Sequence, residues 1–314
     1  MTPAGEAPGR RVVALVGPTA VGKSETAARL AETLGAEIVS CDSMQIYRGL
    51  DIGTAKPGPD VRGRVAHHLL DVVDPAHDLT VSEFQARARA AIAEISGRGR
   101  LPLLVGGSGL YFRAVVDDLS FPPRSPEVRR RLEAEAARLG PAALHARLAA
   151  HDPEAADRIE PGNARRIVRA LEVMEITGRP FSRDYTWDRF GGPFSLSVAG
   201  LSRDRAELYA RIEGRIDEML RAGLIEEART LAVGGFGPTA RQALGYRQIL
   251  QVPPETPVAE IRAAIVRATK KFARRQESWF RADPRVRWFD AGAPGLDEDL
   301  IAWFRLDTDP PPAL

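Results

Sequence analysis

Residues 11–24 read RVVALVGPTAVGKS, and this stretch decides the fold. The β-branched run at 11–16 ends at a glycine, which predicts a short buried strand. Apolar residues recur at helical spacing over residues 24–34, so a helix is expected to follow. The residues between strand and helix are Gly17, Pro18, Thr19, Ala20, Val21, Gly22, Lys23 and Ser24. In this context they fit the phosphate-binding P-loop pattern.

The P-loop predicts a ligand that carries phosphate groups. Glycines at both ends allow backbone amides to turn inward around phosphate oxygens, and the helix that follows adds the positive end of its dipole. Lys23 supplies a full positive charge, and the Ser24 hydroxyl is suited to hold Mg²⁺. The motif predicts the eight residues 17–24 as the phosphate site, but it does not specify the ligand.

Strands and helices alternate beyond the P-loop. Residues 36–40, 101–105, 194–201 and 286–289 read as strands, which predicts an α/β fold with a P-loop NTPase-like parallel sheet flanked by helices. Residues 126–177 show only helical periodicity. We therefore expect a discontinuous catalytic core at 11–120 and 196–290, a helical insertion domain at 121–195, and disordered tails at 1–10 and 307–314.

Composition narrows the function classes. The 314 residues suit one large domain and a smaller one, and the net charge of +2 does not by itself indicate a nucleic-acid partner. The single cysteine, Cys41, allows no intramolecular disulfide and reads as a buried apolar filler. No signal peptide or long apolar run is seen, so we expect a cytoplasmic protein without a membrane partner. The pair His67-His68 lacks a third ligand at metal-binding spacing and predicts a structural role.

Asp42 follows the predicted strand 36–40. Ligands of open α/β sheets bind beyond the carboxyl ends of the strands, so Asp42 should lie near the P-loop. Its carboxylate could be a metal ligand, a helix cap or a general base. The strand 101–105 ends in glycines and not in the aspartate of a Walker-B strand, which disfavours phosphoryl transfer.

Several further motifs occur in one order along residues 11–290. They are Asp42-Ser43-Met44-Gln45-Ile46-Tyr47, Asp51-Ile52-Gly53-Thr54-Ala55-Lys56-Pro57, His67-His68-Leu69-Leu70-Asp71, Val105-Gly106-Gly107-Ser108-Gly109-Leu110-Tyr111, the helical run 163–173, Gln242-Ala243-Leu244-Gly245-Tyr246-Arg247 and residues 274–280 (RRQESWF). Together with the P-loop they resemble the tRNA dimethylallyltransferases. The resemblance implies that the exocyclic amine of the adenine 3′ of the anticodon attacks dimethylallyl diphosphate, and that diphosphate leaves from the P-loop.

The resemblance also implies roles for individual residues. Asp42 becomes the general base, Lys23 and Mg²⁺ offset the charge of the leaving diphosphate, and Arg215 contacts that diphosphate. Read from the residues alone, Arg215 and its neighbour Arg211 are more simply solvated helix charges. Ser108 stands where the family has threonine, and it keeps the hydroxyl.

The tRNA contacts implied by the resemblance are more widely spread. They are Asp42, Ser43, Met44, Gln45, Ser108, Arg129, Arg165, Arg166, Ile167, Val168, Arg169, Gln242, Ala243, Leu244, Gly245, Tyr246 and Arg247. The charge distribution predicts three more tRNA contacts without reference to the family, namely Lys271, Arg274 and Arg275. Residues 262–287 hold nine lysines and arginines, and only Glu277 and Asp283 oppose them. A solvated helix face is the alternative for this stretch, and Trp279 and Phe280 within it read as core.

Three alternatives remain open to sequence analysis. An adenylate dimethylallyltransferase would share the P-loop and Asp42 but modify free AMP, ADP or ATP. A P-loop small-molecule kinase would consume ATP, and a non-catalytic RNA-binding protein would need neither Lys23 nor Asp42. The arginines of the helical insertion and the basic stretch favour tRNA, and a monomer is expected.

Overall fold

The computed structural model describes residues 9–119, 121–184 and 190–306. Within it the chain divides into two compact units, a larger one formed by 1–117 and 192–314 and a smaller one formed by 118–191. Of the tails expected at 1–10 and 307–314, residues 1–8 and 307–314 lie outside the described residues, and Arg10 belongs to a strand.

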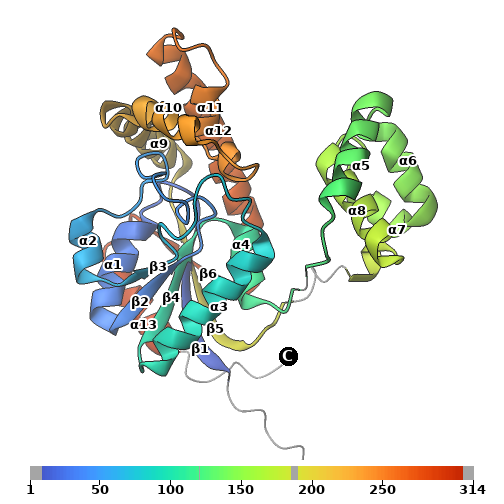
Figure 1. Cartoon of the computed structure of the whole chain (residues 1–314). Coiled ribbons are helices and arrows are strands. Elements are labelled where there is room, and N and C mark those ends of the chain that lie inside the picture. The colour runs from blue at the N-terminus through green and yellow to red at the C-terminus, as the bar shows by residue number, and fades with distance from the viewer. Residues whose placement is uncertain (1–8, 120, 185–189, 307–314) are drawn as a thin grey trace, which may run out of the picture. The chain divides into compact units, whose positions relative to one another are not determined.

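A six-stranded sheet forms the centre of the larger unit (Figure 1). Its strands are β1 (Arg10–Val16), β2 (Ala36–Ser40), β3 (His67–His68), β4 (Leu101–Gly106), β5 (Phe194–Ser202) and β6 (Val286–Asp290). They lie in the order β3-β2-β4-β1-β5-β6, and every neighbouring pair is parallel. The predicted α/β fold class is confirmed.

The strands follow from short apolar runs. Val12 to Val16 in β1 are fully buried because β4 and β5 flank this strand and helices cover it. β1 begins at Arg10, one residue earlier than expected. β3 was not predicted, since a strand of two residues has no measurable periodicity. It places His68 Nε2 2.7 Å from Glu37 Oε2, which agrees with a structural role for the histidine pair.

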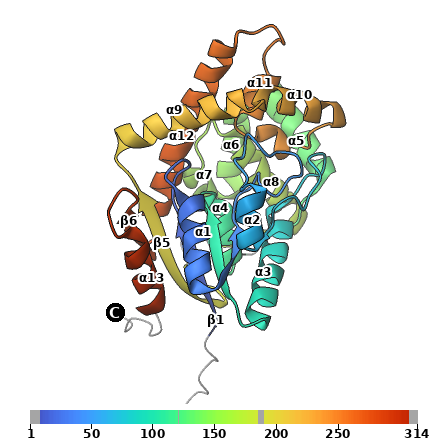
Figure 2. The same ribbon diagram turned by 90° about the vertical axis from the view of Figure 1, so that its left-hand side faces the viewer.

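Helices surround the sheet and extend beyond one edge of it. Those of the larger unit are α1 (Lys23–Leu34), α2 (Pro59–Arg64), α3 (Val81–Gly97), α4 (Gly109–Val116), α9 (Arg205–Arg221), α10 (Leu224–Gly234), η2 (Ala240–Gln242), α11 (Tyr246–Leu250), α12 (Val258–Arg281) and α13 (Leu296–Leu306). Figure 2 shows α9, α10 and α11 beyond the carboxyl ends of the strands, with α12 running alongside. This edge is where a P-loop ligand would bind.

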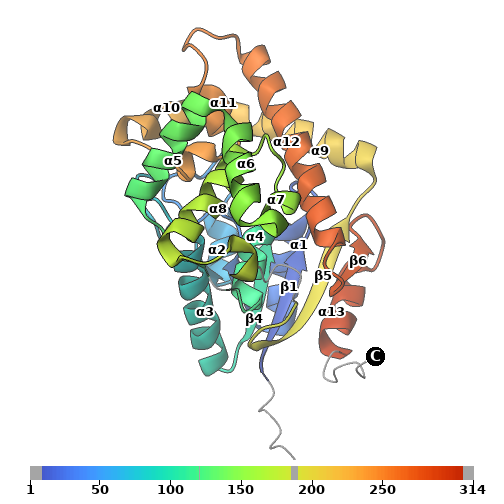
Figure 3. The same ribbon diagram turned by 90° about the vertical axis from the view of Figure 1, so that its right-hand side faces the viewer.

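The smaller unit is helical and has its own core. It contains α5 (Pro126–Leu139), α6 (Pro141–His151), α7 (Pro153–Arg158), α8 (Ala164–Thr177) and η1 (Phe181–Asp184). α5, α6 and α8 pack on one another (Figure 3), around buried Leu132, Leu144 and Ile167. The helices α6 and α7 begin at Pro141 and Pro153, because proline suits the first turn of a helix.

None of the described helices is long and apolar enough to cross a membrane.

Candidate active site

The P-loop connects β1 to α1 at the carboxyl edge of the sheet. Gly17 has φ 145° and Gly22 φ 118°, a backbone conformation that favours glycine. A Cβ at Gly17 would lie 2.6 Å from the carbonyl oxygen of Leu201, so no side chain fits there. Gly22 gives α1 no side-chain cap, which leaves the first amides of α1 available to an anion.

Lys23 lies half-buried in the loop that it closes. Its Nζ donates a hydrogen bond of 2.7 Å to the carbonyl oxygen of Pro18. Burial and, to a lesser degree, the nearby Arg215 lower the pKa of Lys23 to about 7, while Asp42 acts in the opposite direction. The surrounding negative charge is thus not enough to keep the pKa of Lys23 at its usual value. A bound diphosphate would add negative charge beside the ammonium and raise that pKa.

Two arginines of α9 reach the P-loop. Arg211 Nε donates to the carbonyl oxygen of Ala20 at 2.9 Å, and Arg215 Nη1 lies 3.5 Å from Thr19 Oγ1. Burial lowers the pKa of Arg215, and Asp42 works in the opposite direction. The interpretation as a solvated helix charge is therefore wrong for Arg215, which is partly buried against the phosphate loop, whereas Arg211 is exposed and contacts that loop from the surface.

Asp42 follows β2 in a turn, and no helix begins there. Its Oδ1 accepts backbone N–H groups of Met44 at 2.8 Å and Gln45 at 3.3 Å, so one oxygen caps the turn. Over the described part of the chain, Oδ2 makes no hydrogen bond. Because Asp42 influences the pKa values of both Lys23 and Arg215, the three charges share one site.

Ser108 begins α4 at the end of the neighbouring strand β4. Its Oγ donates a hydrogen bond of 3.3 Å to Ser43 Oγ, which joins the loops after β2 and β4 beside Asp42. The close approach depends on Gly106, where a Cβ would lie 2.5 Å from the carbonyl oxygen of Cys41. Cys41 itself is buried, as expected of an apolar filler.

Gln276 of α12 belongs to the motif at residues 274–280, and the sequence predicts no role for its side chain. Its Oε1 accepts the N–H of Thr19 at 2.9 Å, and its Nε2 donates to the carbonyl oxygen of Gly107 at 2.9 Å. The available signal was a polar residue on the apolar face of a helix, between Ala273 and Phe280, which are both buried.

The segment 242–247 lies near α10 and is partly internal. Ala243 and Tyr246 are buried, while Gln242 and Arg247 are exposed and joined by a hydrogen bond of 3.3 Å. The Tyr246 hydroxyl donates to Glu227 and accepts the N–H of Gly53 at 3.1 Å. The side chains that can meet a large ligand here are those of Gln242 and Arg247.

The smaller unit contains the other predicted arginines. Arg165 and Arg166 are exposed at the start of α8, whereas Ile167 and Val168 lie in its core and do not face solvent. Arg169 donates to the carbonyl oxygens of residues 122 and 123 and to buried Glu172.

Glu172 also binds Arg129, with Arg129 Nη2 2.7 Å from Glu172 Oε2. Although burial alone would raise the pKa of Glu172, its hydrogen bonds with Arg169 and Arg129 lower it. Arg129 and Arg169 are thus structural residues in this conformation, and Arg165 and Arg166 are the exposed cations.

The basic stretch falls mainly on α12, and its charges form two groups. Arg262, Lys270, Arg281 and Arg285 pair with carboxylates. Arg287 lies in β6 and stacks on the rings of Phe289 and Trp303. The remaining four are exposed on α12 and have no carboxylate partner among the described residues. These are Arg267, Lys271, Arg274 and Arg275, which we call the basic stripe. At 3.6 residues per turn, Arg267, Lys271 and Arg274 lie opposite the buried face of α12.

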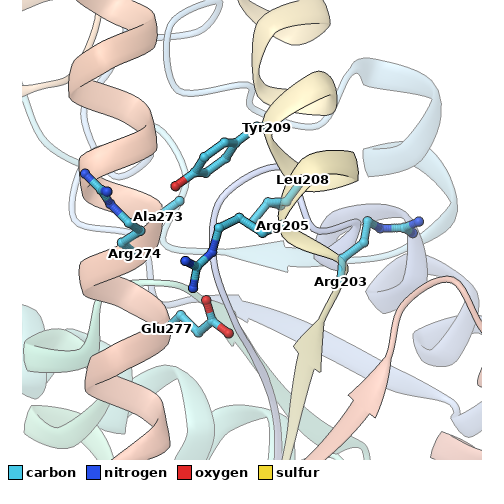
Figure 4. Close-up of a pocket in the computed structure, with 7 residues that line it drawn as sticks. All are labelled: Arg203, Arg205, Leu208, Tyr209, Ala273, Arg274 and Glu277. Atoms are coloured by element: carbon cyan, nitrogen blue, oxygen red, sulfur yellow. The ribbon is translucent and has the colours of Figure 1, made fainter.

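A cavity of about 170 Å³ lies between α9 and α12 (Figure 4). Arg203, Arg205 and Tyr209 line it from α9 and the residues before it, and Arg274 and Glu277 line it from α12. Figure 4 shows Arg205 extending toward Glu277, while the guanidinium of Arg274 points away from the cavity. Among the described residues that line the cavity, none belongs to the P-loop, and Arg205 is the one arginine of α9.

The chain matches known families and structures over most of its length. A family model described as IPP transferase matches residues 45–283, and one described as isopentenyl transferase matches residues 10–66. A tRNA dimethylallyltransferase of Streptomyces coelicolor is 53% identical over 294 residues, which cover 93% of this chain and 94% of that protein. One of Thermobifida fusca is 53% identical over 299 residues, with 93% of each covered.

Solved structures agree with these matches. The tRNA isopentenylpyrophosphate transferase of Bacillus halodurans has a TM-score of 0.69 at 38% identity, covering 95% of this chain and 98% of that one. A eukaryotic dimethylallyltransferase acting on tRNA has a TM-score of 0.76 at 25% identity, covering 90% of this chain and 74% of that one.

Proposed function

The chain belongs to the IPP transferase family, the family of the tRNA dimethylallyltransferases, and we propose that it prenylates the adenine 3′ of the anticodon in tRNA. The exocyclic nitrogen of the adenine attacks the first carbon of dimethylallyl diphosphate. The bond between that carbon and the diphosphate oxygen breaks, and diphosphate leaves with the electron pair. Family membership disfavours the kinase alternative, which would move phosphate.

The observation that supports this chemistry is the meeting of Asp42, Lys23 and Arg215 at one edge of the sheet. Asp42 has one carboxylate oxygen engaged in its turn and the other available to take the proton from the adenine amine. Lys23, Arg215 and the first amides of α1 surround the place where the leaving diphosphate gains charge. Ser108 is suited to hold the acceptor beside Asp42.

Mg²⁺ fits this site through the Ser24 hydroxyl at the start of α1 and the phosphate oxygens of the ligand. No group of three His, Cys, Asp or Glu side chains that could hold a metal occurs among the described residues. The Ser24 hydroxyl as the protein ligand agrees with a magnesium ion held mainly by substrate oxygens and water. When bound, the ion would offset the negative charge of the diphosphate.

We propose that tRNA contacts both units. The exposed cations Arg165 and Arg166 of the smaller unit, Arg247, and the basic stripe can bind backbone phosphates. The target base must leave its stack to reach Asp42. One chain supplies the P-loop, Asp42 and Arg215, so we propose that the enzyme acts as a monomer, in the cytoplasm where tRNA is found.

Mass spectrometry of products tests the function directly. The protein is incubated with dimethylallyl diphosphate and Mg²⁺, and in parallel with an unmodified tRNA that carries the target adenine or with AMP. We expect a dimethylallyl adduct on the tRNA only. An adduct on AMP only would identify the protein as an adenylate prenyltransferase. If the folded protein gives no adduct on tRNA or on AMP, prenyl transfer is refuted.

The basic stripe is expected to carry part of the salt dependence of tRNA binding. Substituting alanine for Lys271, Arg274 and Arg275 together should weaken tRNA binding by about tenfold or more at low salt. The slope of log affinity against log salt should fall by about 2 to 3, because about one counterion is released for each phosphate contact. Filter binding at several salt concentrations measures both quantities.

A variant of equal charge change provides the control. Alanine at Arg29, Arg64 and Arg305 also removes three exposed positive charges, but from α1, α2 and α13. This control should leave the salt slope close to that of the wild type. Equal slopes for the two triple variants would show that the basic stripe makes no local contact with tRNA.

A further inference from the structure

Gln276 connects two loops of the active site from the inner face of α12. The side chain is buried, with 6% of its surface exposed, and both ends of its amide are occupied. Oε1 accepts the N–H of Thr19 in the P-loop at 2.9 Å. Nε2 donates to the carbonyl oxygen of Gly107, in the loop after β4, also at 2.9 Å. One side chain therefore holds together the loops that follow β1 and β4.

The fit around Gln276 leaves little room for rearrangement. A Cβ at Gly107 would lie 2.2 Å from Gln276 Nε2 and 3.0 Å from the carbonyl oxygen of Gly17. One turn further along α12, Trp279 packs on Gly109, where a Cβ would lie 2.1 Å from the indole ring. The helix α12 thus packs against the glycine-rich loop at residues 106–109 through two neighbouring side chains, Gln276 and Trp279.

The hydrogen bond to Thr19 determines how the P-loop presents its groups. Because Gln276 occupies the Thr19 N–H, a phosphate must be bound by the amides that follow in the loop and in α1. The same residue carries the hydroxyl that lies 3.5 Å from Arg215 Nη1, so the position of the Thr19 backbone sets where that hydroxyl can reach. Gln276 therefore fixes the position of the P-loop relative to the loop that carries Ser108. It also fixes the position of Thr19, the P-loop residue next to Arg215.

We infer that Gln276 is a positioning residue for the diphosphate of the prenyl donor, acting through the Thr19 and Gly107 backbones and touching no substrate itself. The inference rests on the proposed prenyl transfer. Inorganic diphosphate is the direct probe, because its binding requires neither tRNA nor turnover. A failure of the inference would leave wild-type prenylation of tRNA intact, and so the two can be told apart.

The first variant is Gln276→Met, which keeps the side-chain length and removes both hydrogen bonds. We expect diphosphate affinity and kcat/KM for dimethylallyl diphosphate to fall about tenfold to a hundredfold, with KM for tRNA changed by less than about threefold. Calorimetry and steady-state kinetics with each substrate varied give these values. An equal effect on the KM of both substrates, or none on diphosphate affinity, would overturn the inference.

Gln85→Met is the matched control for a purely structural loss. Gln85 is half-buried in α3, and its Nε2 donates 2.7 Å to the carbonyl oxygen of Ala114 in the same unit, away from the P-loop. We expect it to lower the melting temperature as Gln276→Met does, while diphosphate affinity stays within about twofold of wild type. Loss of diphosphate affinity in both variants to the same degree would assign the effect to stability and overturn the inference.

Gln276→Glu supplies a second test, the pH dependence of diphosphate affinity, which a change in stability alone would not alter. It tests the inference even if the Met variant does not fold. A protonated carboxyl can accept the Thr19 N–H and donate to the Gly107 carbonyl, as the amide does. The ionised carboxylate would place a negative oxygen against that carbonyl. The diphosphate affinity of the variant relative to wild type should therefore rise as pH falls from about 9 to about 6. A ratio that does not change with pH would overturn the inference.

Discussion

Replacing Asp42 by alanine or by asparagine should abolish most prenyl transfer while leaving tRNA bound. Loss of a positioned base costs about a hundredfold to ten-thousandfold in rate, and both variants lack one. They differ in structure, because asparagine can still accept the Met44 and Gln45 N–H groups at 2.8 and 3.3 Å that shape the turn, whereas alanine cannot. Single-turnover rates with saturating tRNA measure the chemical step, and filter binding measures tRNA affinity.

The asparagine variant separates the base from the other roles open to this carboxylate. Asp42 lies close enough to Lys23 and Arg215 to affect the pKa values of both. Removing its negative charge should leave diphosphate binding unchanged or tighter, since an anion then enters a more positive site. If Asp42 were needed mainly as a metal ligand, diphosphate affinity in Mg²⁺ would fall. If it mainly shaped the turn, asparagine would retain most of the activity.

The conformation of the P-loop could be predicted from the sequence because its signal is local. Residues 11–24 alone indicate strand, loop and helix, and all three are found in the structure. The position of Asp42 near the P-loop could also be predicted, since the carboxyl ends of parallel strands meet at one edge of a sheet. Arg215 is different. Helical periodicity gives its face on α9 but cannot tell which element that face meets, so the residues alone favoured a solvated charge.

Long-range packing explains the remaining misses. The helix α13 was not predicted, although Leu296, Leu300 and Phe304 repeat every four residues and are buried beside α1. Gln276 lies 257 positions from the Thr19 amide that it binds, and no local pattern pairs a glutamine with a distant backbone group. A polar residue on an apolar helix face indicates that some buried partner exists, but the partner is known only once the loops are packed.

Replacing Lys23 by methionine should remove prenyl transfer almost completely while making the ligand-free protein more stable. The charge lost is one that opposes negative charge on the leaving diphosphate, and such groups contribute about a hundredfold to a thousandfold in rate. The variant keeps the length of the side chain and loses the hydrogen bond of 2.7 Å to Pro18. Tight tRNA binding should persist. The matched control is Lys270→Met on α12, whose ammonium pairs with Glu213, and it should remain active.

The stability gain follows from the pKa of Lys23. Burial lowers that pKa from 10.5 to about 7 in the folded, ligand-free protein. Between these values the unfolded chain binds the proton and the folded chain does not, so Lys23 destabilises the fold fully below pH 7 and less as pH rises toward 10.5. Lys23→Met should therefore raise the melting temperature most at neutral pH and lose this advantage in alkali. A variant that is inactive and less stable would instead indicate a structural lysine.

Diphosphate binding should restore the missing proton. An anion beside Lys23 raises its pKa, so at about pH 8 binding should take up a proton from the buffer, and affinity should weaken as pH rises above about 7. Calorimetry in two buffers of different ionisation enthalpy counts the protons, and Lys23→Met should reduce the uptake. Uptake that is the same in the variant would assign the proton to the diphosphate itself. Uptake that disappears with the lysine would mean that the P-loop keeps Lys23 poorly neutralised until the prenyl donor arrives, which makes the diphosphate its natural counterion.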